Sequence, residues 1–367
     1  MNPYRVRTTY ERTVAHRTRP PFAYCAEQDG VIESIDDKTK ILVVKYKNGN
    51  KTAVQFGDQF TNNGGGGFYC TQNIVINNFK VGDKVKRGDV IVYNEHFFTP
   101  DPYNKQVDWN MGVAANVACI EANDTLDDGN AISKTLADKL EFNPVHVRDV
   151  VLKKTTTVHK YASVGTVVNN TDPLLIFDQS EMTDDMFGKL DDEGIELLSK
   201  LNRQTPKAKF TGRIVKIDAF YKCPVEEMAD GLKGIVAVVA REKIAKHKAA
   251  GDASNSNEYK PYHQIKYTDR IGTTDLDNDT VILRFYIQQD MICACGDKIE
   301  FGGPFKSVNS RVQDDDWDVE DGSMKVHALF SSIGIANRIA LSPLLTGTTA
   351  RVAEQLEKNI LKMYFEE

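Results

Sequence analysis

Residues 295–308 read CGDKIEFGGPFKSV, and the interpretation of the whole chain depends on this stretch. A Gly-Asp-Lys turn opens it, and Lys306 follows Lys298 eight positions later, beyond the pair Gly302-Gly303. A lysine ammonium suits a phosphate oxygen, and glycines let a backbone approach a ligand closely. Two interpretations stay open: a clamp for a ligand with several phosphates, or a pair of solvated lysines. A Walker A loop is excluded, because no Gly-Lys-Ser or Gly-Lys-Thr follows the glycines.

An arginine lies in an apolar stretch thirty-two residues after Lys306. Arg338 is part of SSIGIANRIALSP (331–343), where isoleucine and leucine surround it. An arginine in apolar surroundings is costly to bury unless it finds an anion, and its planar fork suits a phosphate. A structural salt bridge to one of the many acidic residues explains the arginine equally well.

Two adjacent carboxylates, Asp127 and Asp128, occur in an acidic turn after the apolar run GVAANVACIEA (112–122). Adjacent carboxylates repel each other, so a cation or hydrogen-bond donors must balance them. The functional interpretation is a metal ligand. The alternative is that one of the two aspartates caps the helix that ISKTLADKL (132–140) predicts.

The composition describes an ordinary globular protein of 367 residues, with 41% hydrophobic and 27% charged residues. The net charge of −6 argues against a free-standing nucleic-acid binder, but not against a subunit with a local basic surface. No apolar run approaches the ~20 residues of a membrane helix, and the polar, basic start is unlike a signal peptide. The six scattered cysteines indicate free thiols and a reducing compartment. Cys293 and Cys295 are half of a zinc site or, in the interpretation we favour, small buried side chains in a strand, so we expect no zinc.

Alternating polar and apolar residues predict strands in most of the chain. The run 30–56 predicts a hairpin around Lys47-Asn48-Gly49-Asn50, and KVGDKVKRGDVIVYN (80–94) predicts two short strands joined by Gly-Asp turns. Further strands are predicted at 146–178, 209–221 and 280–288, helices at 225–251 and near the C-terminus, and a linker at 251–261.

The order and spacing of these elements resemble the second half of the catalytic β subunit of multisubunit DNA-directed RNA polymerases. In that family a Gly-Asp-Lys-x7-Lys element precedes an arginine-bearing NPxGxPSRM element, and Lys298 and Arg338 are forty residues apart here. The family's Glu-Asp pair, which follows a buried strand, corresponds to Asp127-Asp128. Weaker resemblance extends over most of the chain, through Tyr10–Ala15, KVGDKVKRGDVIV and FTGRIVKIDAFY.

The resemblance implies a role for each of these residues. Lys298 and Lys306 are expected to contact the phosphates of the incoming nucleotide or the RNA 3′ end, and Arg338 the triphosphate. Asp127 and Asp128 are expected near the second Mg²⁺, directly or through water. The implied reaction is two-metal phosphoryl transfer, in which the 3′-hydroxyl attacks the α-phosphate.

The resemblance also implies the fold: α+β and β-rich, with a double-psi β-barrel built from two sequence-separated halves. A flap-like β module and a helical connector are inserted between the halves. The expected segments are an N-terminal β-rich segment (1–74), the first barrel half (75–145), the flap-like module (146–222), the connector and linker (223–261), the second barrel half (262–345) and a C-terminal helix (346–367).

Activity is expected only in a complex, because the family's magnesium-holding aspartates belong to the β′ subunit. The chain resembles a split β fragment of the kind that some large bacteriophages encode. The implied partners are a β′-like chain with a DxDGD loop, other β fragments, a sigma-like factor, DNA template, RNA and nucleoside triphosphates, with no membrane. The implied location is the cytoplasm, that of the host for a phage protein, or the virion. Apolar surface is then expected to face the partner chains.

Two other functions remain open. Gly302-Gly303-Pro304-Phe305 stands where the family has Arg-His-Gly-Asn, so hydrogen-bond donors are lost. This departure favours a non-catalytic structural or virion protein that retains the barrel. A third interpretation, an independent nucleotide-binding enzyme, lacks a nucleophile, a base and a metal set of its own.

Overall fold

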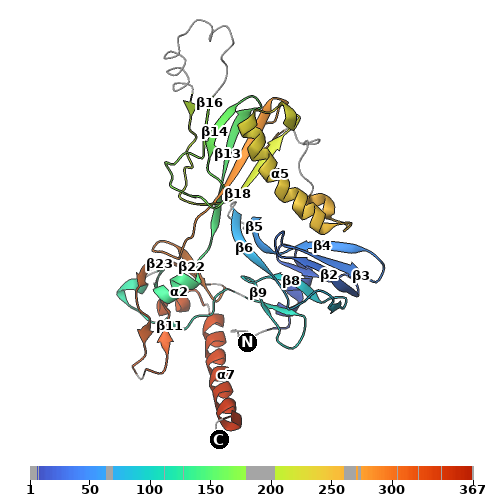
Figure 1. Ribbon diagram of the computed structural model, residues 1–367. Coiled ribbons are helices and arrows are strands. Elements are labelled where there is room, and N and C mark those ends of the chain that lie inside the picture. The colour runs from blue at the N-terminus through green and yellow to red at the C-terminus, as the bar shows by residue number, and fades with distance from the viewer. Residues whose placement is uncertain are drawn as a thin grey trace.

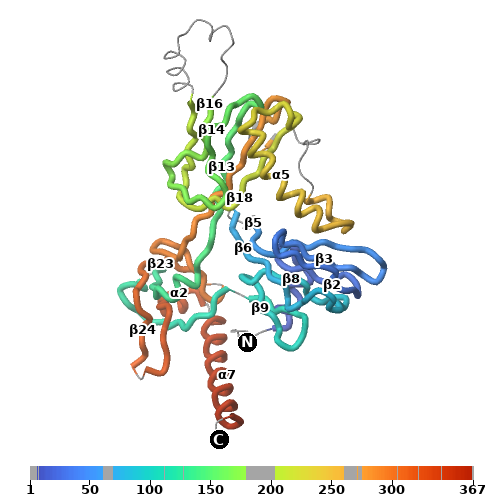
Figure 2. Tube along the Cα trace, in the orientation of Figure 1, coloured from blue at the N-terminus to red at the C-terminus, as the bar shows by residue number. Residues whose placement is uncertain are grey.

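The computed structural model is a mixed α+β, β-rich protein with curled sheets (Figure 1). It describes residues 6, 8–62, 69–110, 112–126, 128–178, 203–259, 270–271, 274–303, 305–320, 322–339 and 341–365. Figure 2 shows an N-terminal body, an upper body carrying α5 (Asp230–Ala250), and a third body from which α7 (Ser342–Phe365) projects. No helix of the described segments combines the length and the apolarity needed to cross a bilayer.

One large sheet joins the N-terminal body to the upper body. Its strand order is β1-β8-β6-β13-β21-β18-β15, with β5 paired to β6. The bounds are β1 (Ala23–Cys25), β5 (Gly57–Asn62), β6 (Tyr69–Ile76), β8 (Val90–Asn94), β13 (Pro144–Lys153), β15 (Val167–Val168), β18 (Gly212–Tyr221) and β21 (Thr280–Gln288).

The N-terminal body adds a four-stranded sheet, β4-β3-β2-β7. The hairpin predicted around Asn48-Gly49 is confirmed, because β3 and β4 pair antiparallel across that turn. The bounds of this sheet and of its small neighbours are β2 (Gly30–Asp36), β3 (Ile41–Tyr46), β4 (Lys51–Gln55), β7 (Lys84–Val85), β9 (Phe98–Pro100), β10 (Val107–Trp109), α1 (Glu11–Val14) and η1 (Ala15–Arg17).

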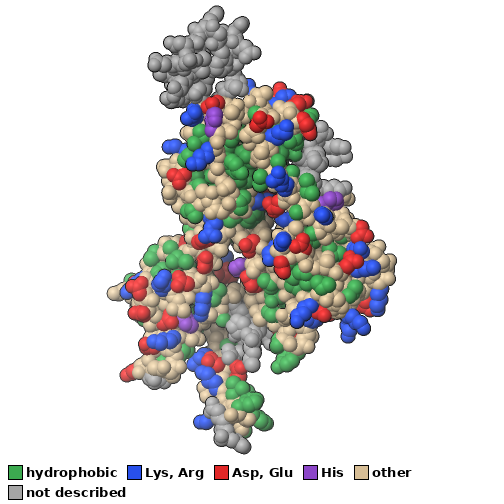
Figure 3. Space-filling view, viewed as in Figure 1, with side chains coloured by type: hydrophobic (Ala, Val, Ile, Leu, Met, Phe, Trp, Pro, Cys, Tyr) green, Lys and Arg blue, Asp and Glu red, His purple; other side chains and the backbone are tan. Residues whose placement is uncertain are grey.

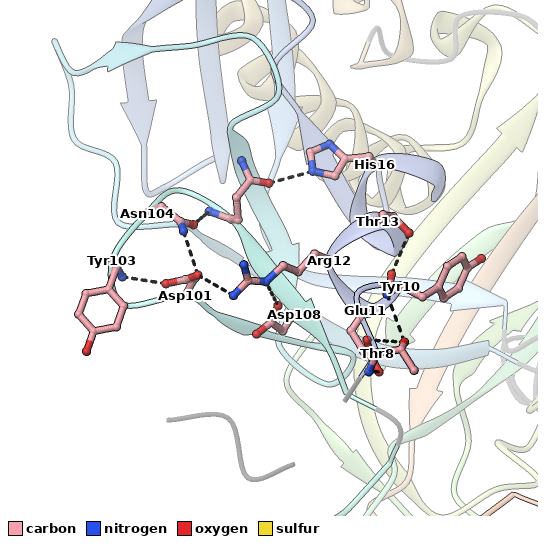
Figure 4. A network of polar contacts seen from close by, with 11 residues as sticks. Thr8, Tyr10, Glu11, Arg12, Thr13, His16, Asp101, Tyr103, Asn104 and Asp108 are labelled. Atoms are coloured by element: carbon pink, nitrogen blue, oxygen red, sulfur yellow. Dashed lines mark hydrogen bonds and ion pairs between the residues drawn. The ribbon is translucent and has the colours of Figure 1, made fainter. Parts of the chain in front are cut away.

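A network of polar contacts fixes the N-terminal segment to the loop between β9 and β10 (Figure 4). Arg12 reaches Asp108 with Nε at 3.3 Å and Asp101 with Nη2 at 3.6 Å. The buried Glu11 accepts hydrogen bonds from the backbone and hydroxyl of Thr8 at 3.0 and 2.8 Å. The stretch Tyr10–Ala15 is therefore held against β10 and the loop that precedes it.

The upper body packs α5 over the large sheet. Leu232, Ile235 and Val236 of the helix are buried in the same cluster as Phe285 of β21. The remaining elements of this body are β14 (Thr157–Tyr161), β16 (Leu175–Asp178), β17 (Arg203–Gln204), η4 (Val225–Glu227), β19 (Arg270–Ile271) and β20 (Thr274–Asp275).

The stretch 251–259 differs from the predicted linker. The side chain of Asn255 donates to the carbonyl of Ala53 and accepts from its backbone N–H, at 2.5 and 3.0 Å. Ala250 and Ala253 pack against Ile41 and Val43. The segment, with η5 (Ser256–Tyr259), is therefore docked on the N-terminal sheet, since its small residues fit closely against β3 and β4.

The third body interleaves two distant parts of the chain in a five-stranded sheet, β11-β26-β12-β23-β22. Strands β11 and β26 are parallel, as are β12 and β23, whereas β12 and β26 are antiparallel. Its elements are β11 (Val117–Cys119), η3 (Asn123–Thr125), β12 (Gly129–Ser133), α2 (Lys134–Lys139), β22 (Lys298–Phe301), β23 (Phe305–Gln313), β24 (Trp317–Asp318), β25 (Lys325–Val326), β26 (Ala328–Phe330) and α6 (Ser332–Asn337).

The sheet pairing divides the chain differently from the segments that the resemblance implies. β8 belongs to the large sheet, although it lies in the segment 75–145. β21 lies between β13 and β18, although it belongs to the segment 262–345. All of β8 is buried, and β21 buries its alternate residues Val281, Leu283, Phe285 and Ile287, so both are interior strands of the larger sheet.

Candidate active site

The two lysines lie on one exposed face of the β22–β23 hairpin. Lys298 is paired with Val308, and Glu300 with Lys306, so the lysines are diagonal neighbours on the same face. The alternate residues Ile299, Phe305 and Ser307 face inward. Strand periodicity thus presents both ammonium groups to solvent, and neither lysine forms an ion pair with any described carboxylate.

Asp128 lies directly beside this hairpin. Its carbonyl accepts hydrogen bonds from the backbone of Val308 at 2.9 Å and from the hydroxyl of Ser307 at 2.6 Å. The next residue, Gly129, begins β12. A Cβ added to Gly129 would lie only 3.0 Å from the carbonyl oxygens of Asp124 and Leu126, so the turn packs closely against this glycine. The tight turn before β12 therefore delivers Asp128 to β23. Asp127 lies outside the described residues.

The predicted helix cap is wrong. Strand β12 separates Asp128 from α2, because Ile132 is buried as part of the sheet instead of starting the helix. Ser133 is the N-cap, and its side chain accepts a hydrogen bond from the backbone of Leu136. The acidic turn thus has no role at the N-terminus of α2.

Arg338 joins the hairpin and the acidic turn. Its Nη2 donates to Oδ1 of Asp128, and its Nη1 donates to the carbonyl of Lys306 at 3.2 Å. The guanidinium also lies over the ring of Phe305, 5.4 Å from the centroid. The structure therefore brings Asp128, Lys306 and Arg338 together and places Lys298 on the adjacent strand.

The position of Arg338 depends on α6, which Glu121 holds in place. One carboxylate oxygen of Glu121 accepts from the hydroxyls of Ser331 and Ser332 and from the backbone of Ile333, at 2.9, 2.9 and 2.8 Å. These bonds hold the pKa of Glu121 below its ordinary value, the backbone hydrogen bond from Ile333 being the largest cause. The sequence motifs did not identify Glu121. Its position near the end of the apolar run 112–122 is the only feature of the sequence that marks it.

The glycine pair has a structural explanation that differs from the expected approach to a ligand. Gly302 and Gly303 both have positive φ, +61° and +91°, in the connection between β22 and β23. A Cβ on Gly302 would lie 2.7 Å from Cβ and Cγ of Pro343. Gly302 therefore lets the hairpin approach the first turn of α7.

The described residues offer little to a metal ion by themselves. No group of three or more His, Cys, Asp or Glu side chains in the described segments is arranged to hold one. Asp128 presents a single exposed carboxylate, which is already paired with Arg338. A Mg²⁺ ion commonly takes one or two carboxylates together with waters and phosphates, so the donors fit only a shared site.

The two neighbouring cysteines differ in exposure. Cys293 is buried beside Phe305, and Cys295 is exposed. Burial, with a smaller contribution from Asp297, raises the pKa of the Cys293 thiol to about 11. The expectation of two buried side chains in a strand is therefore wrong: Cys293 is buried but lies outside any strand, and Cys295 is exposed in the turn before β22.

The chain also carries aspartates at alternate positions that the motifs above leave out, in Asp275-Leu276-Asp277-Asn278-Asp279. Asp275 and Asp277, with Lys222, line a polar depression of about 430 Å³. Asp279 points elsewhere, to Lys154 at 3.0 Å. These aspartates therefore do not converge as a metal-binding triad.

Compared with the models of known protein families and with curated proteins, the chain matches none of them.

Proposed function

We propose that this chain is a catalytic-core, β-like subunit of a split multisubunit DNA-dependent RNA polymerase. One observation carries the proposal: Lys298, Lys306, Arg338 and Asp128, drawn from segments up to 210 residues apart, gather at one hairpin. A cluster of cations on a rigid strand pair suits the charge that develops during phosphoryl transfer. In this proposal the five-stranded sheet with its two parallel strand pairs is the core of a double-psi β-barrel.

The chain's own residues would position the nucleotide. Lys298 and Lys306 offer unpaired ammonium groups to phosphate oxygens, and Arg338 offers a planar fork for a triphosphate. Asp128, with Asp127, would approach a Mg²⁺ held mainly by a β′-like partner with a DxDGD loop. When bound, the metal would stabilise the attacking and leaving oxygens. In this proposal the subunit works in the cytoplasm, that of the host for a phage protein, or in the virion.

The exposed apolar side chains of α7 support a subunit that requires partners. Leu345, Val352 and Leu356 are 58–68% exposed, and Tyr364 and Phe365 follow near the end of the helix. Figure 3 shows hydrophobic side chains along one side of this projecting helix. Apolar surface of this kind commonly marks a protein interface.

The second candidate is a non-catalytic structural protein that retains the same fold. The Arg338–Asp128 pair favours it, because the arginine already has an internal anion and needs no ligand. The loss of donors at Gly302–Phe305 favours it too.

RNA synthesis by the assembled complex distinguishes the two candidates. The chain is purified with its partner chains, and elongation from an RNA–DNA scaffold is measured for the K298A/K306A variant. Loss of elongation with intact assembly is the expected result. The matched control is K134A/K139A, which removes two exposed lysines from α2 in the same body. Normal elongation by K298A/K306A would exclude the catalytic assignment.

A further inference from the structure

Two consecutive segments of the N-terminal body fold into the same turn. In Lys80–Asp83 and in Lys86–Asp89, the aspartate carboxylate accepts the backbone N–H of the lysine at 2.8 Å. The aspartate N–H donates back to the lysine carbonyl, at 3.1 and 3.0 Å. The third residue of each turn is glycine, with φ of +89° and +87°, as a type II turn requires. Each acid is thus used to close its own turn.

Both turns are fixed to the sheet beneath them. The N–H groups of Gly82 and Gly88 donate to the carbonyls of Ile32 and Ala26, each at 2.8 Å. Between the turns, β7 pairs with β2, and its Val85 is buried. The backbone that carries the neighbouring side chains is therefore rigidly held.

Four cations project from this frame: Lys80, Lys84, Lys86 and Arg87, which we call the twin-turn surface. All four are exposed, and none forms an ion pair with a carboxylate of the described segments. Lys84 and Lys86 are exposed on either side of the buried Val85, and two residues of extended backbone span roughly 7 Å. Figure 3 shows Lys and Arg side chains on the N-terminal body.

The carboxylates around the twin-turn surface are outnumbered by its four cations. Asp83 and Asp89 are engaged within the turns, and Asp29 pairs with Lys47 at 2.7 Å while accepting the backbone N–H of Arg87. A further cation lies close by. Gln106 donates to the carbonyl of Gly88 and bonds His16, and the residue after that histidine is the exposed Arg17.

We propose that the twin-turn surface binds the phosphate backbone of a nucleic acid. Exposed lysine and arginine side chains on a fixed frame make contacts with phosphates that are independent of sequence. A protein interface needs an apolar core, and Val81 is the single large apolar side chain exposed within residues 80–89. The surface belongs to a different sheet from the β22–β23 hairpin that carries Lys298 and Lys306, so the inference is independent of the proposed catalytic role.

Fluorescence anisotropy of labelled single-stranded and duplex DNA, titrated with the full chain over a range of salt concentrations, tests this assignment. The test variant is K80E/K84E/K86E/R87E, with a milder variant that carries glutamine at the same positions. The matched control, K38E/K139E/K160E/K248E, makes the same change in net charge with exposed lysines dispersed elsewhere. Circular dichroism and thermal unfolding establish that each variant is folded.

The expected result is at least tenfold weaker binding by both test variants at low salt, with the control close to the parent chain. For duplex DNA, the magnitude of the slope of log K against log salt should fall by about 3.6, since each of the four phosphate contacts contributes ~0.9. Equal losses in the test and control variants would overturn the proposal, because net charge alone would then explain binding. Equally tight binding of polyglutamate would overturn it too, in favour of an acidic protein partner.

Discussion

Arg338 donates a hydrogen bond to the carboxylate of Asp128, a residue 210 positions earlier in the chain. The pair joins the end of α6 to the turn before β12, and the same guanidinium also bonds the carbonyl of Lys306. One arginine therefore connects the acidic turn to the hairpin that carries both lysines. The side chains of Arg338 and Asp128 are 41% and 63% exposed, so an anionic ligand can compete for the arginine.

The first prediction concerns the energy of this pair. Because both partners are exposed, D128A should lower the free energy of unfolding by no more than about 1 kcal/mol. R338A should lower the free energy of unfolding somewhat more than D128A, since it also removes the contacts of Arg338 with Lys306 and Phe305. Urea denaturation of both single variants and of D128A/R338A gives the coupling energy. A coupling of several kcal/mol would mean that the pair is mainly structural, which favours the non-catalytic candidate.

The second prediction is a pH dependence that originates at Glu121. The hydrogen bonds from α6 lower its pKa in the folded chain below the ordinary value of 4.5. A lowered folded pKa contributes stability above the unfolded pKa, and this contribution is lost as the pH falls through the folded pKa. Thermal unfolding of the parent chain between pH 7 and pH 3 should therefore include a loss of stability that E121Q lacks.

E141Q supplies the control for that comparison, because Glu141 is exposed and its carboxylate bonds no helix of the described residues. Equal pH dependence in E121Q and E141Q would contradict the role assigned to Glu121. In the assembled complex, E121Q should also weaken use of the nucleotide, by displacing Arg338.

The third prediction concerns thiol reactivity. With its pKa raised to about 11, Cys293 should be about one part in a thousand thiolate at pH 8. Iodoacetamide should therefore modify the exposed Cys295 well before Cys293, as peptide mass spectrometry would detect. The C295S variant isolates the slow reaction of Cys293. Comparable rates for the two thiols would show that Cys293 is not buried as described.

Local patterns predicted the hairpin at β3–β4, because strand periodicity and turn glycines act over a few residues. They also predicted strands where β8 and β21 lie, but an apolar run does not specify which sheet a strand joins. The polar stretch 251–261 was predicted to be a linker. In the structure, the side-chain amide of Asn255 instead pairs with the backbone of Ala53.

The candidate site shows the same limit. The charge pattern identified Arg338 and left its anion open between phosphate and carboxylate. The structure supplies the carboxylate of Asp128. Glu121 could not be found in this way, because its function depends on an α6 terminus 210 to 212 residues away. Contacts at this separation come from the topology of the sheet, which no short motif contains.

The last prediction separates two neighbouring glycines. Gly302 and Gly303 both have positive φ, so either alanine substitution should cost about 1 kcal/mol of backbone strain. At Gly302 the new Cβ would also lie 2.7 Å from the side chain of Pro343, whereas at Gly303 the nearest atom is an oxygen of Glu300 at 4.0 Å. Overpacking of this kind adds about 1–3 kcal/mol or displaces α7. G302A should therefore be less stable in urea than G303A, and trypsin should cleave its α7 faster at Arg351 and Lys358. Equal behaviour of the two variants would mean that the contact between the hairpin and Pro343 does not hold α7 in place.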